Sequence, residues 1–141
     1  MPRTAFIACS KTKRNAPCTA KQMYQGALFK KALTYCERHF EQVYILSAKY
    51  GLVSLTQIIS PYEQTLNAMS KLEREAWGRK VAAQLQQAGL FDSNELWFFT
   101  GARYHEFFDG HKPLAGLSLG YQLKWFADRL TQKEKTGGFG L

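Results

Sequence analysis

Three segments of the chain repeat one arrangement, in which an apolar run ends in a hydroxyl residue and a cation follows within one to three positions. The segments are residues 6–11, 43–49 and 96–103. Their hydroxyl residues and cations are, in chain order, Ser10 with Lys11, Ser47 with Lys49, and Thr100 with Arg103. Hydroxyl and cationic groups hold phosphates and other anions through charge-assisted hydrogen bonds. The arrangement therefore predicts an anion-binding site, if the three segments meet in space.

The apolar runs themselves indicate how the segments meet. Short continuous apolar runs bounded by polar or glycine residues are typical of buried strands in a parallel sheet. The carboxyl ends of such strands lie side by side, and ligands of open α/β sheets bind at that edge. We therefore expect Ser10, Ser47 and Thr100 to end neighbouring parallel strands at one edge. The alternative is that small and charged residues merely end the strands.

Strand and helix patterns alternate along the chain, which predicts an α/β fold. We expect a single three-layer domain over residues 1–130, with a mostly parallel central sheet and helices on both faces. Residues 131–141 lose periodicity and are expected to form a mobile tail. After the first strand, the predicted strands are residues 42–47 and 95–100, and the predicted helices are residues 23–40, 70–88, 102–109 and about 121–130.

The connections between these elements carry their own signals. Ser70 and Glu73 form a capping-box pattern at a helix start, and Gly89 is expected to stop that helix. Residues 10–22 are predicted to be a loop, and a second irregular segment is predicted after residues 49–53 and through residues 61–63. Residues 114–120 are predicted to form a short strand and turn.

The formal net charge of +8 is concentrated in the first third of the chain. Residues 1–49 hold nine Lys or Arg and two Glu, whereas residues 50–141 hold ten basic and nine acidic residues. The excess thus lies in the part that supplies the first two strand ends. Such asymmetry favours a polyanion or a phosphorylated small molecule as partner. A basic solvated face that aids solubility is the alternative.

The densest basic cluster directly follows the first strand and contains Ser10, Lys11, Lys13 and Arg14. Its backbone amides and side chains can hold an anion. It lacks the glycine pattern of a nucleotide P-loop, which argues against an ATPase. We expect no cofactor.

The segment after the second strand adds an aromatic residue and a carboxylate. Tyr50 follows Lys49 and either stacks on a nucleobase or covers the core. Gly51 permits a tight turn with positive φ. Farther on, Glu63 is the best candidate for a catalytic acid or base, and an inert surface carboxylate is the alternative.

The three cysteines are odd in number and lack Cys-x-x-Cys spacing, so we expect free thiols without a disulfide framework or a structural zinc site. Cys36 and His39 have no third ligand at a suitable local spacing, and no metal site is predicted. No apolar run is long enough to span a membrane, and no signal-peptide core follows Met1. We expect a cytoplasmic protein without a membrane partner, and its oligomeric state stays open.

Three motifs resemble those of the YaaA-like peroxide-stress proteins and of related uncharacterised bacterial and phage domains. They are Ile-Ala-Cys-Ser-Lys-Thr-Lys at residues 7–13, Ile-Leu-Ser-Ala-Lys-Tyr-Gly-Leu-Val at 45–53 and Pro-Tyr-Glu at 61–63. Residues 113–123 also look like the shorter uncharacterised domains. The resemblance touches most of residues 5–126, and its specific part is the second motif. This chain is considerably shorter than a typical YaaA protein.

The resemblance implies a compact α/β fold with a basic cleft, DNA binding and a role in limiting oxidative damage. A similarity of plan to uracil-DNA-glycosylase-like domains makes nucleobase or glycosidic chemistry conceivable, by fold analogy.

Two functions are therefore hypotheses. The first is a nucleic-acid-binding protein, most simply a DNA-binding one, with cations on the phosphates and Tyr50 on an exposed base. The second is an enzyme acting on a nucleotide or modified nucleobase, with Glu63 as acid or base. The predicted binding residues in both cases are Ser10, Lys11, Lys13, Arg14, Ser47, Lys49, Tyr50, Gly51, Thr100 and Arg103.

Overall fold

A four-stranded sheet forms the centre of the protein, and our computed structural model describes residues 2–91 and 95–137. In spatial order its strands are β4 (Gly51–Ser54), β3 (Gln42–Ser47), β1 (Arg3–Ala8) and β6 (Glu95–Phe99). β1 pairs in parallel with both β3 and β6, whereas β4 runs antiparallel to β3. The fold is therefore mixed α/β with a mostly parallel sheet.

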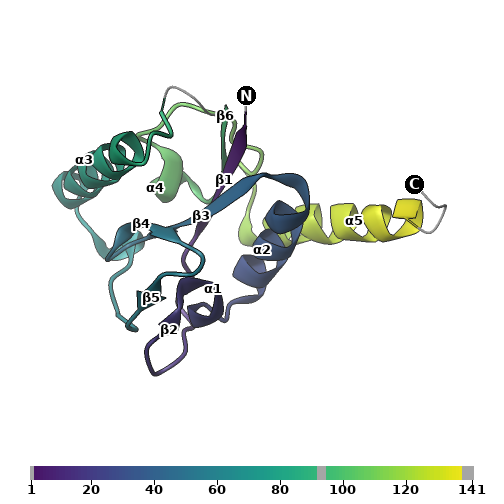
Figure 1. Cartoon of the computed structure of the whole chain (residues 1–141), viewed down its shortest axis with the longest axis horizontal. Helices are drawn as coiled ribbons and strands as arrows, with labels where there is room; N and C mark the ends of the chain where they lie inside the picture. Colours follow the sequence, from purple (N-terminus) through teal and green to yellow (C-terminus); the bar gives the residue numbers. More distant parts are fainter. Residues whose placement is uncertain (1, 92–94, 138–141) are drawn as a thin grey trace.

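Helices lie on both sides of this sheet (Figure 1). The helices of the described residues are α1 (Ala20–Met23), α2 (Ala27–His39), α3 (Lys71–Gln87), α4 (Ala102–His105) and α5 (Leu119–Gly137), with a 3₁₀ turn, η1, at Leu66–Ala68. α2 packs against α5 on one side, and α3 contacts β4 on the other.

Two adjacent residues of β6 show how the sheet organises the core, because successive strand residues point to opposite faces. Phe98 stacks on Phe6 with ring centroids 4.8 Å apart and on Phe108 at 5.6 Å. Phe99 meets Tyr35 of α2 at 5.7 Å and Phe126 of α5 at 6.0 Å. Both faces of the sheet are thus covered by aromatic packing.

The capping-box prediction is confirmed at the start of α3. The Ser70 hydroxyl accepts a hydrogen bond from the Glu73 amide at 3.2 Å, and the Glu73 carboxylate accepts one from the Ser70 amide at 2.8 Å. The hydrogen bond from the Ser70 amide, and after it the Ser70 side chain, lower the pKa of the Glu73 carboxyl. Gly89 follows the helix with φ 72°, a conformation that favours glycine, and the chain leaves the helix there as predicted.

No strand was predicted between residues 49 and 63, and the structure has two there. The chain turns at Lys49–Tyr50 and returns as β4, with Ser47 opposite Gly51. A second antiparallel pair joins β2 (Cys18–Thr19) to β5 (Ile58–Ile59), so the first predicted loop also contains a strand and the short α1. Pairs this short offer too few residues for a period-two pattern to stand out in the sequence.

Helix boundaries also differ from those predicted. The helix predicted over residues 23–40 begins only at Ala27, and α5 continues to Gly137 instead of ending near residue 130. Residues 114–120 form a turn and the start of α5, not a strand. The last part of the predicted tail, residues 138–141, lies outside the described residues. Over the described ranges, no helix is both long and apolar enough to cross a membrane.

Candidate functional site

The three predicted strand ends lie at one edge of the sheet. Ala8 pairs with Leu46 of β3, and Ile7 pairs with Phe99 of β6. Each hydroxyl residue comes at the carboxyl end of its strand or within two residues of it. The prediction that Ser10, Ser47 and Thr100 end neighbouring parallel strands is therefore confirmed.

A cavity of about 360 Å³, here called the polar cavity, lies beyond the end of β1. Its walls include Cys9, Ser10, Lys11, Lys13, Glu63 and Tyr104. It thus brings two predicted cations and the predicted carboxylate to one space. Glu63 comes from the segment between β5 and η1, far in sequence from the two lysines.

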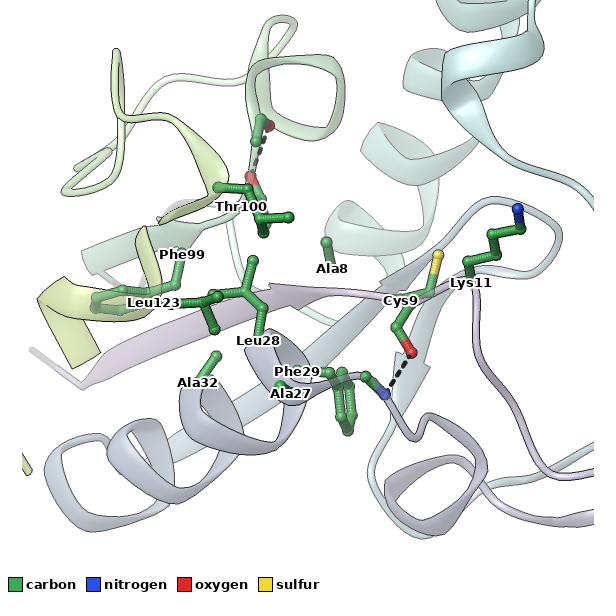
Figure 2. Close-up of a pocket in the computed structure, with 14 residues that line it drawn as sticks. Ala8, Cys9, Lys11, Ala27, Leu28, Phe29, Ala32, Phe99, Thr100 and Leu123 are labelled. Carbon is green, nitrogen blue, oxygen red and sulfur yellow. Dashed lines mark hydrogen bonds between the residues drawn. The ribbon is translucent and has the colours of Figure 1, made fainter. Parts of the chain in front are cut away.

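A second cavity of about 350 Å³, here called the apolar cavity, lies between α2 and the start of α5. Its wall is mainly apolar and includes Leu28, Phe29, Phe99 and Leu123. Thr100 is one of its few polar residues. Figure 2 shows Leu28, Phe99 and Leu123 together, with Cys9 and Lys11 at the other end. The two cavities share Cys9, Ser10 and Lys11 in their walls.

Ser10 holds the loop after β1 against the start of α2. Its hydroxyl donates to the Thr12 carbonyl at 2.9 Å and accepts from the Gly26 amide at 3.2 Å. A Cβ on Gly26 would lie 2.9 Å from the Ser10 Cβ, so glycine permits this close approach. The first turn of α2 has neither a side-chain cap nor an acidic residue, and its amides add partial positive charge beside Ser10.

Lys13 is placed over an aromatic ring. Its ammonium lies 4.4 Å from the centroid of Tyr62 and 3.3 Å from the Lys11 carbonyl, to which it donates. The cation–π contact restricts Lys13 without neutralising it, because a ring carries no net charge. Lys11 itself is exposed. Neither lysine forms an ion pair with a carboxylate within the described part of the chain.

Cys9 and Tyr104 meet at the base of the polar cavity. The Cys9 sulfur lies 3.2 Å from the Tyr104 hydroxyl, within hydrogen-bonding distance. Burial raises the pKa of the Tyr104 phenol, so this hydroxyl is protonated near neutral pH. Tyr104 also makes an edge contact with Trp77 of α3, with centroids 5.7 Å apart. This contact fixes the Tyr104 part of the cavity wall to α3.

Ser47 has a different environment from Ser10, because it is fully buried. Its hydroxyl accepts from the amides of Lys49 at 3.2 Å and Tyr50 at 2.9 Å, and donates to the Tyr62 hydroxyl at 2.8 Å. Tyr62 in turn lies 2.7 Å from the Tyr24 hydroxyl. Burial raises the pKa of Tyr24 to about 12, so this network is uncharged near neutral pH. Ser47 lines neither cavity and holds the β3–β4 turn.

Tyr24 and Tyr62 are residues whose role the sequence prediction missed. Both are buried, at 1% and 7% exposure, yet both carry hydroxyls that need partners. Tyr62 belongs to the Pro-Tyr-Glu motif, in which the prediction considered the carboxylate alone. The sequence feature that pointed to this role is a large aromatic residue within a segment predicted to be irregular. The ring supports Lys13 while its hydroxyl binds Ser47, so it links the hairpin to the polar cavity.

Thr100 lines the apolar cavity and is 2% exposed. Its hydroxyl donates to the Gly101 carbonyl at 3.1 Å and lies 3.3 Å from Nδ1 of His105. The third strand end therefore also uses its hydroxyl locally.

The remaining predicted cations do not line either cavity. Lys49 lies over the Tyr50 ring, 5.2 Å from its centroid, and Arg103 is exposed on α4. The Arg14 side chain donates to the Gln22 carbonyl at 2.9 Å. The expectation that Lys49 and Arg103 enter the same crevice as Lys11 is not met, because their segments turn into β4 and α4. Whether these three cations contact phosphate stays a prediction.

Tyr50 is half-buried beside the network. Its ring meets Tyr62 edge-on at 5.6 Å, and its hydroxyl donates to the Ser60 carbonyl at 3.3 Å. These contacts favour the alternative in which Tyr50 covers the core, while base stacking stays a prediction. Gly51 adopts φ 76°, and a Cβ there would collide with the Gln84 side chain, which binds the neighbouring backbone. Gly51 thus serves the turn.

Within the described residues, no three or more His, Cys, Asp or Glu side chains lie close enough together to hold a metal ion. Cys36 is buried on α2, and burial raises the pKa of its thiol. Cys9, Cys18 and Cys36 are all free thiols.

The chain belongs to a family of unknown function, DUF6884, whose sequence profile matches residues 4–128. This match extends from β1 into α5 and so includes both cavities. No curated protein and no solved structure matches the chain. The resemblance to YaaA-like proteins therefore stays a prediction from the three motifs.

Proposed function

We propose that this protein binds nucleic acid, most simply DNA, through phosphate contacts at the polar cavity. The observation that carries the proposal is that Lys11 and Lys13 line one cavity at the carboxyl edge of three parallel strands. Open α/β sheets bind ligands at this edge. The basic excess of residues 1–49 supplies a favourable field for a polyanion approaching the same edge.

In this function Lys11 and Lys13 pair with backbone phosphates, and the loop after β1 fixes their spacing. The Tyr62 ring under Lys13 and the Ser10 bond to Gly26 hold that loop in place. We also infer that the chain acts in the cytoplasm as a single three-layer domain. A link to oxidative-stress protection is an inference from the resemblance alone.

The test is a titration of fluorescent single-stranded DNA at several salt concentrations. Replacing a cation that contacts phosphate reduces the magnitude of the negative slope of log K against log salt by about 0.7 on single strands. We expect this change for Lys11→Ala and for Lys13→Ala. Arg38→Ala is the matched control: Arg38 is exposed near the end of α2, and that helix begins beside Ser10 and runs to the opposite edge of the sheet.

The slope separates site binding from a diffuse field. If Arg38→Ala lowers the slope as much as Lys11→Ala and Lys13→Ala, the basic charge acts without a site and the proposal is wrong. Absence of salt-dependent binding by the unaltered protein would also reject it.

A second function is favoured by the position of Glu63, whose segment lines the polar cavity with Lys11 and Cys9. A carboxylate beside phosphate-binding cations is placed to transfer a proton on a bound nucleotide or modified nucleobase, for example during cleavage of a glycosidic bond. The experiment is chromatography of nucleotide and modified-nucleoside mixtures after incubation with the protein. Turnover that Glu63→Gln abolishes, while DNA affinity is retained, would establish the enzyme.

A further inference from the structure

We propose that the apolar cavity receives a nucleobase of the same nucleic acid whose phosphates bind at the polar cavity, so that the preferred partner is a single-stranded or unstacked nucleotide. This inference rests on the proposed function. It goes beyond it, because phosphate contacts alone do not distinguish single strands from duplexes.

The shared wall of the two cavities carries the inference. Cys9, Ser10 and Lys11 line both, so the two cavities adjoin along these residues. In Figure 2 the Lys11 side chain lies at the far end from Leu28, Phe99 and Leu123, and its ammonium points away from them. A cationic end and an apolar end of adjoining spaces match a ligand with an anionic group next to an apolar ring.

The chemistry of the apolar cavity selects the ring and excludes the phosphate. Phe29 and Phe99 are each 3% exposed and form an apolar wall with Leu28. A phosphate placed between Leu28, Phe99 and Leu123 would lose its hydration at the end of the cavity away from Lys11, and burying an unpaired charge is strongly unfavourable. A nucleobase presents apolar faces and a polar edge. Thr100 and Ser10 are polar wall residues. Each hydroxyl donates to a backbone carbonyl nearby and can meet that edge only through its acceptor lone pairs.

The size and opening of the cavity also suit a base. Its volume of about 350 Å³ lies at the lower end of the range for small-molecule sites, which begins near 300 Å³. Leu119, at the start of α5, is 63% exposed at its wall, and Ala27 is exposed on the first turn of α2. These two residues indicate that the cavity opens to solvent between the helices. A base stacked within a duplex cannot enter it, whereas an unstacked base can.

The experiment compares the binding of two strands by the unaltered protein and by its variants. The strands are a short oligodeoxythymidylate and an abasic strand of the same length, which keeps the phosphates. The unaltered protein should bind the abasic strand about tenfold more weakly, as expected for the loss of one buried base. Ala27→Trp, which fills the apolar cavity from its exposed rim, should bind both strands with the abasic affinity. Its salt slope should be unchanged.

Ala83→Trp is the matched control, because Ala83 is an exposed alanine on α3, on the other side of the sheet. It should discriminate between the strands as the unaltered protein does. Leu123→Ala, which enlarges the cavity, gives a second variant should Ala27→Trp unfold. It should change the ratio of the two affinities and leave abasic binding constant.

The outcomes separate this inference from the proposed function. Equal affinity of the unaltered protein for both strands, with a normal salt slope, would leave phosphate binding standing and reject the base site. Discrimination that survives in Ala27→Trp but is lost in Tyr50→Ala would place the base on Tyr50 and reject the apolar cavity. Absence of salt-dependent binding to either strand would reject both proposals.

Discussion

Ser10 and Ser47 belong to nearly identical sequence patterns at adjacent strand ends, yet the structure gives them opposite environments. Ser10 lies in the walls of two cavities and binds the start of α2. Ser47 is fully buried, and its hydroxyl is used by two backbone amides and by Tyr62. The length of the connection after each strand decides the difference. β1 leads into a long loop, whereas β3 turns at once into β4.

The comparison teaches that the connection after a strand decides whether its terminal hydroxyl is buried within a turn or lines a cavity. A tight hairpin leaves backbone amides near the hydroxyl, and these amides bind it before any ligand can. A long loop leaves the hydroxyl and the cations after it facing a cavity. Lys49 and Lys13 show the same division, since only Lys13 lines a cavity.

The largest effect that would test this division is on stability. Ser47→Ala leaves the Tyr62 hydroxyl and two amides without their partner in a buried site, so it should lower the free energy of unfolding by about 1–3 kcal/mol. Ser10→Ala should lower it by at most about 1 kcal/mol, because water can replace its bonds. Urea unfolding of both variants measures the difference. Equal losses would show that Ser10 is as structural as Ser47.

Tyr50 lies at the boundary between the two regions, and its replacement should have the next largest effect. Tyr50→Ala removes a half-buried ring packed edge-on against Tyr62 and should reduce stability by about 1–2 kcal/mol, less than a fully buried aromatic. Tyr50→Phe should be nearly neutral. Melting temperature and single-strand affinity are measured on the same samples. A loss of affinity in a Tyr50→Ala protein of unchanged stability would support base stacking instead.

A smaller effect separates Lys13 from Lys49, although each lies over a tyrosine ring. Lys13→Ala should lower the salt slope of single-strand binding by about 0.7, the loss of one phosphate contact. Lys49→Ala should match the Arg38→Ala control, since Lys49 lies beside the hairpin and outside both cavities. If Lys49→Ala reduced the magnitude of the slope by the same amount as Lys13→Ala, bound nucleic acid would reach the hairpin.

The sequence predicted the parallel part of the fold because its strands are continuous apolar runs that only a sheet covered on both faces can bury. The common edge of Ser10, Ser47 and Thr100 results from that arrangement. The start of α3 was equally predictable, because Ser70 and Glu73 act within four residues of chain. In these cases the signal is local, or it comes directly from strand direction.

The rest depended on contacts distant in sequence. Lys13 lies over Tyr62, and Cys9 meets Tyr104, although neither pair shares a local pattern. The β3–β4 hairpin was missed because its turn leads into a strand of only four residues. Lys49 lies in the turn that leads into β4 and lines neither cavity. One missed hairpin thus accounts for much of the difference between the predicted binding residues and the residues that line the two cavities.

The smallest expected effect concerns the third strand end, where Thr100 lies beside His105. Burial lowers the pKa of this imidazole, and Lys112 lowers it further against the opposing effect of Glu106. As pH falls below the usual value of 6.5, the unfolded chain takes up a proton that the folded protein resists, so stability should fall with pH until the folded-state pKa is passed. Urea midpoints at several pH values between about 7.5 and 5.5 test this. His105→Asn should flatten the dependence. If stability depended on pH equally in both proteins, His105 would not be a buried neutral partner of the Thr100 hydroxyl. Thr100 would then resemble Ser10 more than Ser47.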